Sequence, residues 1–355
     1  MVWAGKYERH LSAFATLAGF VSDAFFFERV DLLTTQLLFL AYGGGSALLI
    51  AWLHSIESRR GRGKAYPRYR PLLPLTVQFL LGGFLSGTLV VYGKSAVLGV
   101  SWPFLFMLAA ALIGNEFLHR YRERLVFSSL LFFLALYAYA IFTLPVFMGS
   151  IGTAIFLLSS ASALALFSLF LLVLRSIGRD KFAEDMRQIR RGSIAILALI
   201  VFSYSMHILP PLPLALTAGD LYALVEKKNG EYIAHAEEQS WVVRLGASPT
   251  VHLAPGEPLY AYSAVFAPTR LATTIVHRWQ YQNPRTEVWE TVSVVSFPIA
   301  GGRDGGYRGY SMKLNPRAGM WRVNVETREG RVVGRMTARV IPSDTPPVYE
   351  TRVLD

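Results

Sequence analysis

The stretch from Arg187 to Pro213 constrains this chain more than any other, because it joins a hydrophobic half to a polar half. A basic collar precedes an uncharged run from Gly192 to Leu209, and a cluster of prolines follows the run. At about 1.5 Å rise per residue, a helix of this length crosses most of a hydrocarbon core about 30 Å thick. Prolines donate no backbone N–H, so they end the helix. The stretch predicts a membrane span with basic residues at one end.

Composition places the chain among membrane proteins. Its 355 residues are 53% hydrophobic, and the mean hydropathy is +0.37. This is too apolar for an ordinary soluble protein and long enough for a membrane domain and a second domain. Cysteine is absent, which excludes disulfides, thiolate metal sites and cysteine nucleophiles. A domain on the oxidising side of the membrane must therefore be stabilised by packing alone.

Seven apolar segments are interpreted as spans. The first is short or tilted, and we expect it to be retained, since no convincing small-residue cleavage site follows it. The segments are Leu11–Val21, Leu32–Leu53, Leu72–Tyr92, Val100–Leu118, Leu125–Leu144, Ile151–Leu174 and Gly192–Leu209. We therefore predict a membrane α-helical bundle of about seven spans in residues 1–213.

The charge distribution predicts the topology. Segments 1–10, 55–70, 119–124 and 175–191 together hold 17 Lys and Arg residues and six acidic residues. That excess equals the whole net charge of +11, so it indicates a positive-inside pattern and no nucleic-acid surface. We expect a bacterial inner-membrane protein with a cytoplasmic N-terminus, a periplasmic C-terminal domain and membrane lipids as partners.

Polar residues near the spans allow two interpretations. Asp23, Glu28, Arg29 and Asp31 lie between aromatic residues and predict either a polar turn at the outer interface or the entrance to a cavity. Gln78, Asn115 and Glu116 would line a transport pathway if a wet cavity reached them, whereas Glu116 also has basic neighbours within one or two helical turns. Gly83 and Gly87 suit either homo-oligomerisation or packing within the bundle.

Residues 214–355 show short alternating runs broken by Gly and Pro, the pattern of an antiparallel sheet protein. The Arg-Glu-Gly sequence that ends at Gly330 predicts a tight hairpin between the last two strands. The predicted strands are Leu259–Phe266, Thr274–Tyr281, Val288–Phe297, Gly306–Leu314, Trp321–Thr327 and Arg331–Ile341. About seven strands in this length fit an all-β immunoglobulin-like sandwich.

The run from Pro298 to Val340, PIAGGRDGGYRGYSMKLNPRAGMWRVNVETREGRVVGRMTARV, with Val265–Trp279 before it, carries a resemblance. It resembles the C-terminal module of a bacterial family known as domain of unknown function family 2914. The N-terminal GFVSDAFFFERVDLL is similar to the start of multi-span members of that family. The resemblance implies a multi-span membrane protein with this module and implies no chemistry.

Seven residues of the β domain are candidates for ligand or partner binding. His277 and Trp279 share a strand face, and we expect His277 to be a core histidine bonded to a backbone carbonyl, with a ligand contact as the alternative. Arg303 and Arg308 flank a glycine-rich loop that either cradles an anion or makes a turn. Arg322, Arg335 and Arg339, together with Arg331, are expected on the outward face of the final hairpin, beside Glu326. That face either binds a lipid headgroup, an acidic polysaccharide or a partner protein, or is a solvated face that discourages edge pairing.

No catalytic constellation, metal-ligand spacing or cofactor motif is recognisable in the sequence. We therefore predict no catalytic residues, no metal site and no cofactor. We expect a non-enzymatic scaffold or sensor whose β domain binds an envelope protein, lipid or glycan. Two alternatives stay open: a transporter or channel with a periplasmic lid, and a membrane enzyme acting on a lipid-linked envelope substrate.

Overall fold

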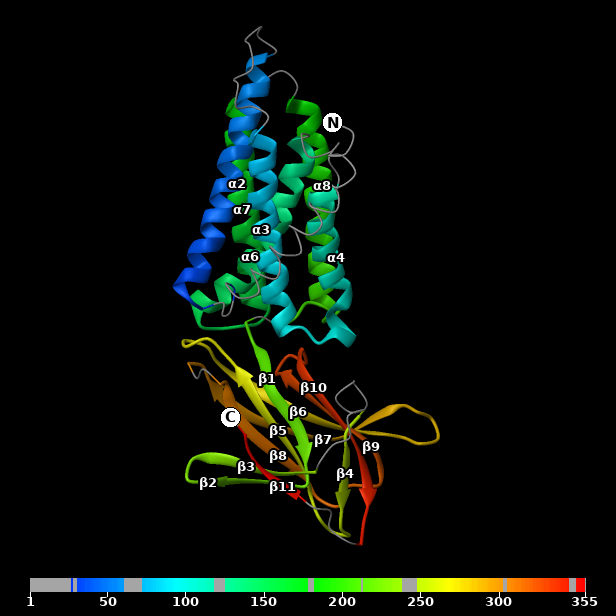
Figure 1. Ribbon diagram of the computed structural model, residues 1–355. Coiled ribbons are helices and arrows are strands. Elements are labelled where there is room, and N and C mark those ends of the chain that lie inside the picture. Colours follow the sequence, from blue (N-terminus) through cyan, green and yellow to red (C-terminus); the bar gives the residue numbers. More distant parts are fainter. Residues whose placement is uncertain are drawn as a thin grey trace, which may run out of the picture. The chain divides into compact units, whose positions relative to one another are not determined.

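The computed structural model describes most of the chain, which divides into a helical unit and a β unit with the main boundary between Leu212 and Pro213 (Figure 1). The described residues are 27, 31–60, 72–117, 125–177, 182–211, 213–237, 248–302, 305–344 and 349–354.

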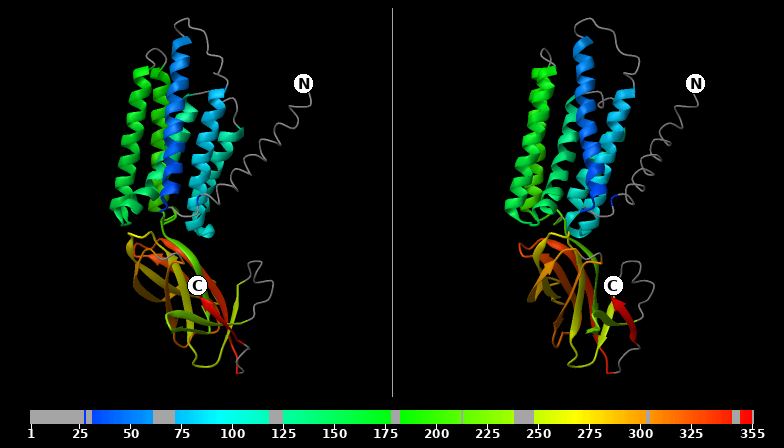
Figure 2. Two further views of the ribbon diagram at one scale, coloured as in Figure 1. Left: turned by 60° about the vertical axis from the view of Figure 1, so that its left-hand side comes forward. Right: turned by 90° about the vertical axis from the view of Figure 1, so that its left-hand side faces the viewer.

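The helical unit is a bundle of long helices that run side by side (Figures 1 and 2). Its helices are α2 (Leu33–Arg60), α3 (Leu72–Ser95), α4 (Leu98–Phe117), α6 (Leu125–Met148), α7 (Thr153–Ile177) and α8 (Phe182–Ser205). Helix α6 lies at the centre of the contacts, since it packs against α2, α7 and α8. Its aromatic side chains Phe133, Tyr137 and Phe142 are fully buried.

The described residues contain six helices where the sequence predicts seven spans. The predicted first span, Leu11–Val21, lies outside the described residues. Four helical segments in the described part are long and apolar enough to cross a membrane, and Gly99–Asn115 is a shorter apolar helix. The four are Leu33–Ser58, Leu72–Ser95, Leu125–Met148 and Thr153–Ile177.

Helix α8 differs from the predicted seventh span at both ends. It begins at Phe182 and therefore includes the basic collar, and it ends at Ser205, before the prolines. His207 adopts a left-handed conformation with φ of 58°, and the Ile208 N–H donates to the Ser203 carbonyl over 2.9 Å. This is the hydrogen-bond pattern of a helix C-cap. The capping turn, and not proline, ends the helix.

Small residues of α3 serve packing within the bundle. A Cβ on Gly83 would lie 2.7 Å from the Tyr42 ring, and a Cβ on Gly87 would lie 2.6 Å from the Phe27 ring. Both glycine positions are thus filled by aromatic rings of the same chain. Asn115 of α4 is 3% exposed and donates from Nδ2 to the Gln78 carbonyl of α3 over 2.9 Å, so it ties two helices together.

The described residues of the β unit form three sheets. Their orders are β1-β5-β8, β4-β10-β9-β6-β7 and β11-β3-β2 (Figure 1). The strands are β1 (Ala215–Tyr222), β2 (Leu224–Lys228), β3 (Glu231–Glu237), β4 (Thr250–Leu253), β5 (Leu259–Phe266), β6 (Ala272–Gln282), β7 (Trp289–Ala300), β8 (Tyr307–Lys313), β9 (Gly319–Thr327), β10 (Val332–Pro342) and β11 (Tyr349–Leu354).

The five-stranded sheet packs against the β1-β5-β8 sheet. Leu216 of β1 packs closely against Gly334 of β10. A Cβ added to Gly334 would lie 2.2 Å from the Leu216 Cδ2 atom. The six strands predicted from sequence are observed within two to three residues at their ends. Trp321, Val323 and Val325 pair with Ala338, Met336 and Gly334, as the alternation predicts. Gly330 takes the positive φ of 79° that the hairpin requires.

The third sheet, β11-β3-β2, was not predicted. Its side chains Val225, Tyr232, Ala234 and Leu354 form a buried cluster with Tyr262 and Ala264 of β5. The third sheet therefore covers the side of β5 that faces away from the five-stranded sheet. As a result β5 is buried on both faces along nearly its whole length.

Candidate functional site

His277 lies in the core between the five-stranded sheet and the β1-β5-β8 sheet, and it contacts side chains of the latter. Its Nε2 atom is 2.8 Å from Ser263 Oγ on β5, and its Nδ1 atom is 2.8 Å from Ser311 Oγ on β8. Trp279 Nε1 donates to the same Ser311 hydroxyl over 2.9 Å. The prediction of a core histidine is therefore correct, but the partners are two serine hydroxyls and not a backbone carbonyl.

Burial determines the charge of His277. The side chain is 0% exposed, and desolvation lowers its pKa to about 4. The imidazole is therefore neutral at physiological pH, with one nitrogen donating and the other accepting. Trp279 is also 0% exposed. Neither side chain is accessible to a ligand, so the structure places both in the core.

The glycine-rich loop is described on both sides of residues 303 and 304. Arg303 and Asp304 lie outside the described residues. The Gly301 N–H donates to the Leu271 carbonyl over 2.8 Å and the Gly302 N–H to the Ala267 carbonyl over 3.2 Å. These two amides are therefore already used by the chain. Arg308 is half-buried, and its Nε atom has no hydrogen-bond partner among the described residues.

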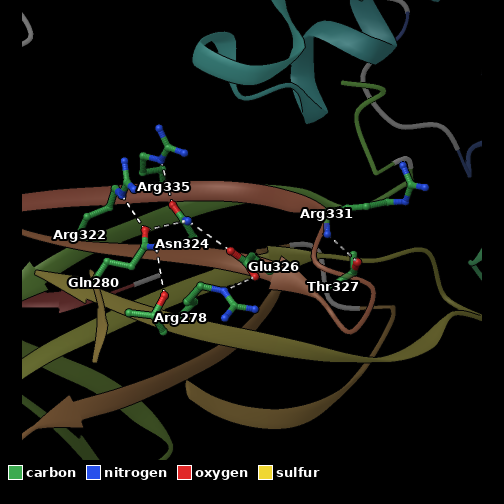
Figure 3. Close-up of polar contacts among 9 residues, drawn as sticks. Arg278, Gln280, Arg322, Asn324, Glu326, Thr327, Arg331 and Arg335 are labelled. Carbon is green, nitrogen blue, oxygen red and sulfur yellow. Dashed lines mark hydrogen bonds and ion pairs between the residues drawn. The ribbon is translucent and has the colours of Figure 1, made fainter. Parts of the chain in front are cut away.

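The outward face of the five-stranded sheet carries a connected polar network (Figure 3). Alternation along β9 points Trp321, Val323 and Val325 into the core, so the residues between them point outward. Asn324 is central: its Nδ2 donates to Gln280 Oε1 and to Glu326 Oε1, both over 3.2 Å. The contact with Gln280 joins β9 to β6, whereas the contact with Glu326 lies within β9.

Three arginines complete this network. Arg322 Nε donates to Gln280 Oε1 over 2.8 Å, and Arg335 Nε donates to Asn324 Oδ1 over 2.9 Å. Arg278 Nε donates to Glu326 Oε2 over 2.9 Å. The Arg322 guanidinium also stacks on the Trp289 ring, 4.1 Å from its centroid. We call these residues the arginine face: Arg278, Gln280, Trp289, Arg322, Asn324, Glu326 and Arg335.

Two of the four arginines predicted beside Glu326 lie apart from the network. Arg331 is only 8% exposed, and its Nε atom lies 3.6 Å from a Glu329 carboxylate oxygen, so it forms a separate pair near the hairpin. The strand begins after it, and the chain is still turning at that point. Arg339 is exposed on β10, and its side chain has no hydrogen bond or ion pair within the described part of the chain.

The membrane-side candidates are only partly described. Asp23, Glu28 and Arg29 lie outside the described residues, whereas Asp31 lies in a turn before α2. The Glu116 side chain is likewise not described.

An apolar cavity of about 380 Å³ lies in the helical unit. Its lining includes Phe39, Gly44, Phe84, Leu136, Tyr139 and Phe170. Within the described residues, no three His, Asp or Glu side chains are grouped to hold a metal ion.

The segment that carries His277 and the arginine face matches a known family. Residues 272–340 match the model described as protein of unknown function (DUF2914). The C-terminal region contains a DUF2914 module. The module runs from the first residue of β6 into β10, so it includes His277 and the whole arginine face. Its partner strands β1, β4 and β5 lie outside the matched DUF2914 residues.

Other comparisons add no function to the DUF2914 match. No curated protein matches the chain. A solved structure of the alkylpurine DNA glycosylase AlkC from Pseudomonas fluorescens, bound to DNA containing an abasic site analogue, shows 9% identity and a TM-score of 0.23. The alignment covers 85% of this chain and 98% of that one. A similarity this low carries no argument about fold or activity.

Sequence reasoning missed the residues that organise the two networks. Gln280 and Asn324 were not singled out, because single amides on alternating strands are common. The available signal was the alternation Arg322-Asn324-Glu326, which puts all three on one face. The pairing of β6 with β9, which sets Gln280 opposite Arg322, follows only from the tertiary structure.

Proposed function

We propose that this chain is a multi-span protein of the bacterial inner membrane whose periplasmic β unit binds an envelope partner and catalyses no reaction. The arginine face is the binding surface. The helical unit anchors the module in the membrane, and the basic excess on one side of the spans supports a periplasmic β unit.

We further propose that the β unit is an immunoglobulin-like sandwich. The five-stranded order β4-β10-β9-β6-β7 packed on β1-β5-β8 supports this assignment. Trp279 on β6, the strand between β9 and β7, is fully buried between the sheets, as a core tryptophan is in immunoglobulin domains. The third sheet is an addition to that pattern.

The observation that carries the binding proposal is the composition of the arginine face and the strand beside it. Arg322 stacks on Trp289, and these residue types are enriched where proteins bind one another. Next to them on β7, Val292 and Val294 are 43% and 50% exposed. An exposed apolar row beside oriented guanidinium groups is the composition of a partner surface.

Site-specific photo-crosslinking in living cells tests this proposal. A photoreactive residue in place of Val294 should give a discrete adduct, whereas the same residue in place of Glu231, exposed on β3, should give none. A second copy of this chain is one identity that the adduct can have. The proposal is overturned if Val294 gives no adduct or if both positions give the same products.

Cysteine labelling tests the topology. Because the native chain has no cysteine, Thr286→Cys and Ser176→Cys each supply a unique thiol at an exposed position. A membrane-impermeant maleimide added to spheroplasts should label the first and spare the second. The reverse pattern would place the β unit in the cytoplasm and remove the envelope partner.

Transport and chemistry on a lipid-linked substrate stay predictions from the sequence. Asn115 is bonded to the backbone of α3, and the 380 Å³ cavity is lined by apolar residues. No observation in the described residues favours either alternative over binding.

A further inference from the structure

Two guanidinium groups on the arginine face are held side by side by one pair of amides. Arg322 binds Gln280 Oε1 through Nε, and Arg335 binds Asn324 Oδ1 through Nε. The two amides are themselves bonded over 3.2 Å. Asn324 is only 6% exposed, so water cannot replace these contacts freely. Figure 3 shows both guanidinium groups on the same side of the sheet.

Both arginines leave their terminal nitrogens available. Each hydrogen bond described for Arg322 and Arg335 uses Nε, and among the described residues the Nη1 and Nη2 atoms have no partner. A guanidinium has five N–H donors in a planar fork. The four terminal nitrogens of the pair therefore offer donors to a group outside the chain.

The positive charge of the pair is not matched within the network. The carboxylate there, Glu326, is 4% exposed and already accepts hydrogen bonds from Arg278 and Asn324. Burial and the neighbouring Arg335 charge lower the pKa of Arg322 to about 10. Arg322 stays charged at physiological pH, so two like charges face the same space. An anion placed there would relieve their repulsion.

The neighbouring surface indicates what kind of molecule carries the anion. Val292 and Val294 on the edge strand β7 are about half exposed, and Trp289 supports Arg322 from beneath. A polysaccharide or a lipid headgroup offers little to cover exposed valines. A protein surface combines acidic with apolar side chains and fits both parts.

We propose that Arg322 and Arg335 together bind a carboxylate side chain of a partner protein, with an apolar residue of that partner covering Val292 and Val294. This inference rests on the proposed function for the arginine face. Gln280 and Asn324 act as positioning residues, since they fix the Nε atoms and direct the terminal nitrogens outward.

The test uses the full chain in detergent micelles and a labelled peptide of alternating valine and glutamate. Its counterpart with glutamine in place of glutamate should bind about tenfold more weakly, because charge-assisted hydrogen bonds are lost. Arg322→Gln and Arg335→Gln should each weaken binding of the glutamate peptide about tenfold. Arg339→Gln, on the same strand as Arg335, is the matched control and should change it less than about twofold.

Each other outcome overturns the proposal in a distinct way. Equal binding of the two peptides removes the carboxylate. A loss in Arg339→Gln as large as in Arg335→Gln reduces the effect to general surface charge. Tighter binding to vesicles of phosphatidylglycerol, lost in Arg322→Gln, or competition by millimolar phosphate that abolishes peptide binding, assigns the pair to a phosphate instead.

The crosslinking experiment separates this inference from the proposed function. If the adduct at Val294 persists in Arg335→Gln, the face binds a partner but the arginine pair does not select it. If the adduct is lost in Arg335→Gln and kept in Arg339→Gln, both proposals are supported.

Discussion

The two polar networks of the β unit lie on opposite faces of the same sheet and differ in one respect. Around His277, every ring nitrogen and the Trp279 N–H reach a serine hydroxyl of the facing sheet. Around Asn324, the amides are satisfied, but the arginines bonded to them keep free donors. The closed network joins two sheets, whereas the open one presents charge to the surroundings.

This difference predicts whether substitutions in each network change the stability of the β unit or its binding. A buried polar group that loses its partner costs its full desolvation, while a half-exposed one can turn to water. Changes at His277 should therefore appear in the stability of the β unit. Changes at the arginines should appear in binding and hardly in stability.

His277→Ala should have the largest effect. It opens a cavity and removes the ring contacts of the Ser263 and Ser311 hydroxyls, which leaves Ser311 with the Trp279 N–H as its partner, and together these losses should cost about 4 kcal/mol. The measurement is the shift of the β-unit transition in urea denaturation of the full chain in micelles. Ile275→Val, equally buried on the same strand, is the control and should cost about 1 kcal/mol. Equal shifts would show that the serine contacts add nothing.

Acidification should weaken the closed network. The pKa of His277 is about 4 in the folded chain, below its ordinary value of 6.5, so below pH 6.5 the unfolded chain takes up a proton that the folded chain does not. The stability contribution is complete above pH 6.5 and falls by about 3 kcal/mol as pH drops to 4. Denaturation midpoints across this range, with His277→Phe as reference, measure it. An identical pH slope in both proteins would contradict the prediction.

Asn324→Ala should separate stability from binding. It removes the acceptor of Arg335 and the donor to both Gln280 and the buried Glu326 carboxylate, so the loss of stability should be about 2 kcal/mol. Binding of the glutamate peptide should fall as much as in Arg335→Gln, because the guanidinium is no longer oriented. A stability loss as large as that of His277→Ala would mean that the two networks do not differ.

Arg335→Gln should have the smallest effect on stability, within about 0.5 kcal/mol of the native chain in either direction. Losing one hydrogen bond to Asn324 is offset by relief of the repulsion with Arg322. Urea denaturation at low and high salt checks this, since the relief should shrink as salt screens the charges. A loss above about 2 kcal/mol would make Arg335 a structural residue.

The sequence predicts the parts of this molecule that depend on local pattern. Alternation located the six strands from Leu259 onward and put Trp321, Val323 and Val325 in the core. Gly330 marked the hairpin. The burial of His277 followed from its apolar neighbours, but the serines lie 14 and 34 residues away in the chain, so no local pattern could identify them.

The third sheet illustrates what pattern alone cannot supply. Strand β5 reads LYAYSAVF, a mostly apolar run that does not alternate and is interrupted by Ser263, which is typical of a strand buried on both faces. That signal was present, yet it does not say which residues cover the second face. Strands β2, β3 and β11 cover the second face of β5. In the sequence, β2 and β3 lie near the start of the β unit, whereas β11 follows the last predicted strand.

Gly301 and the arginine pair of the DUF2914 module are under different structural constraints. A Cβ on Gly301 would lie 1.7 Å from the Pro268 carbonyl oxygen, so no side chain of any kind fits there. The glycine at position 301 is thus required by the close approach of two backbone segments. Arg322 and Arg335 are under no such steric rule. We expect a relative that keeps Gly301 but replaces those arginines to keep the fold and to bind a different partner.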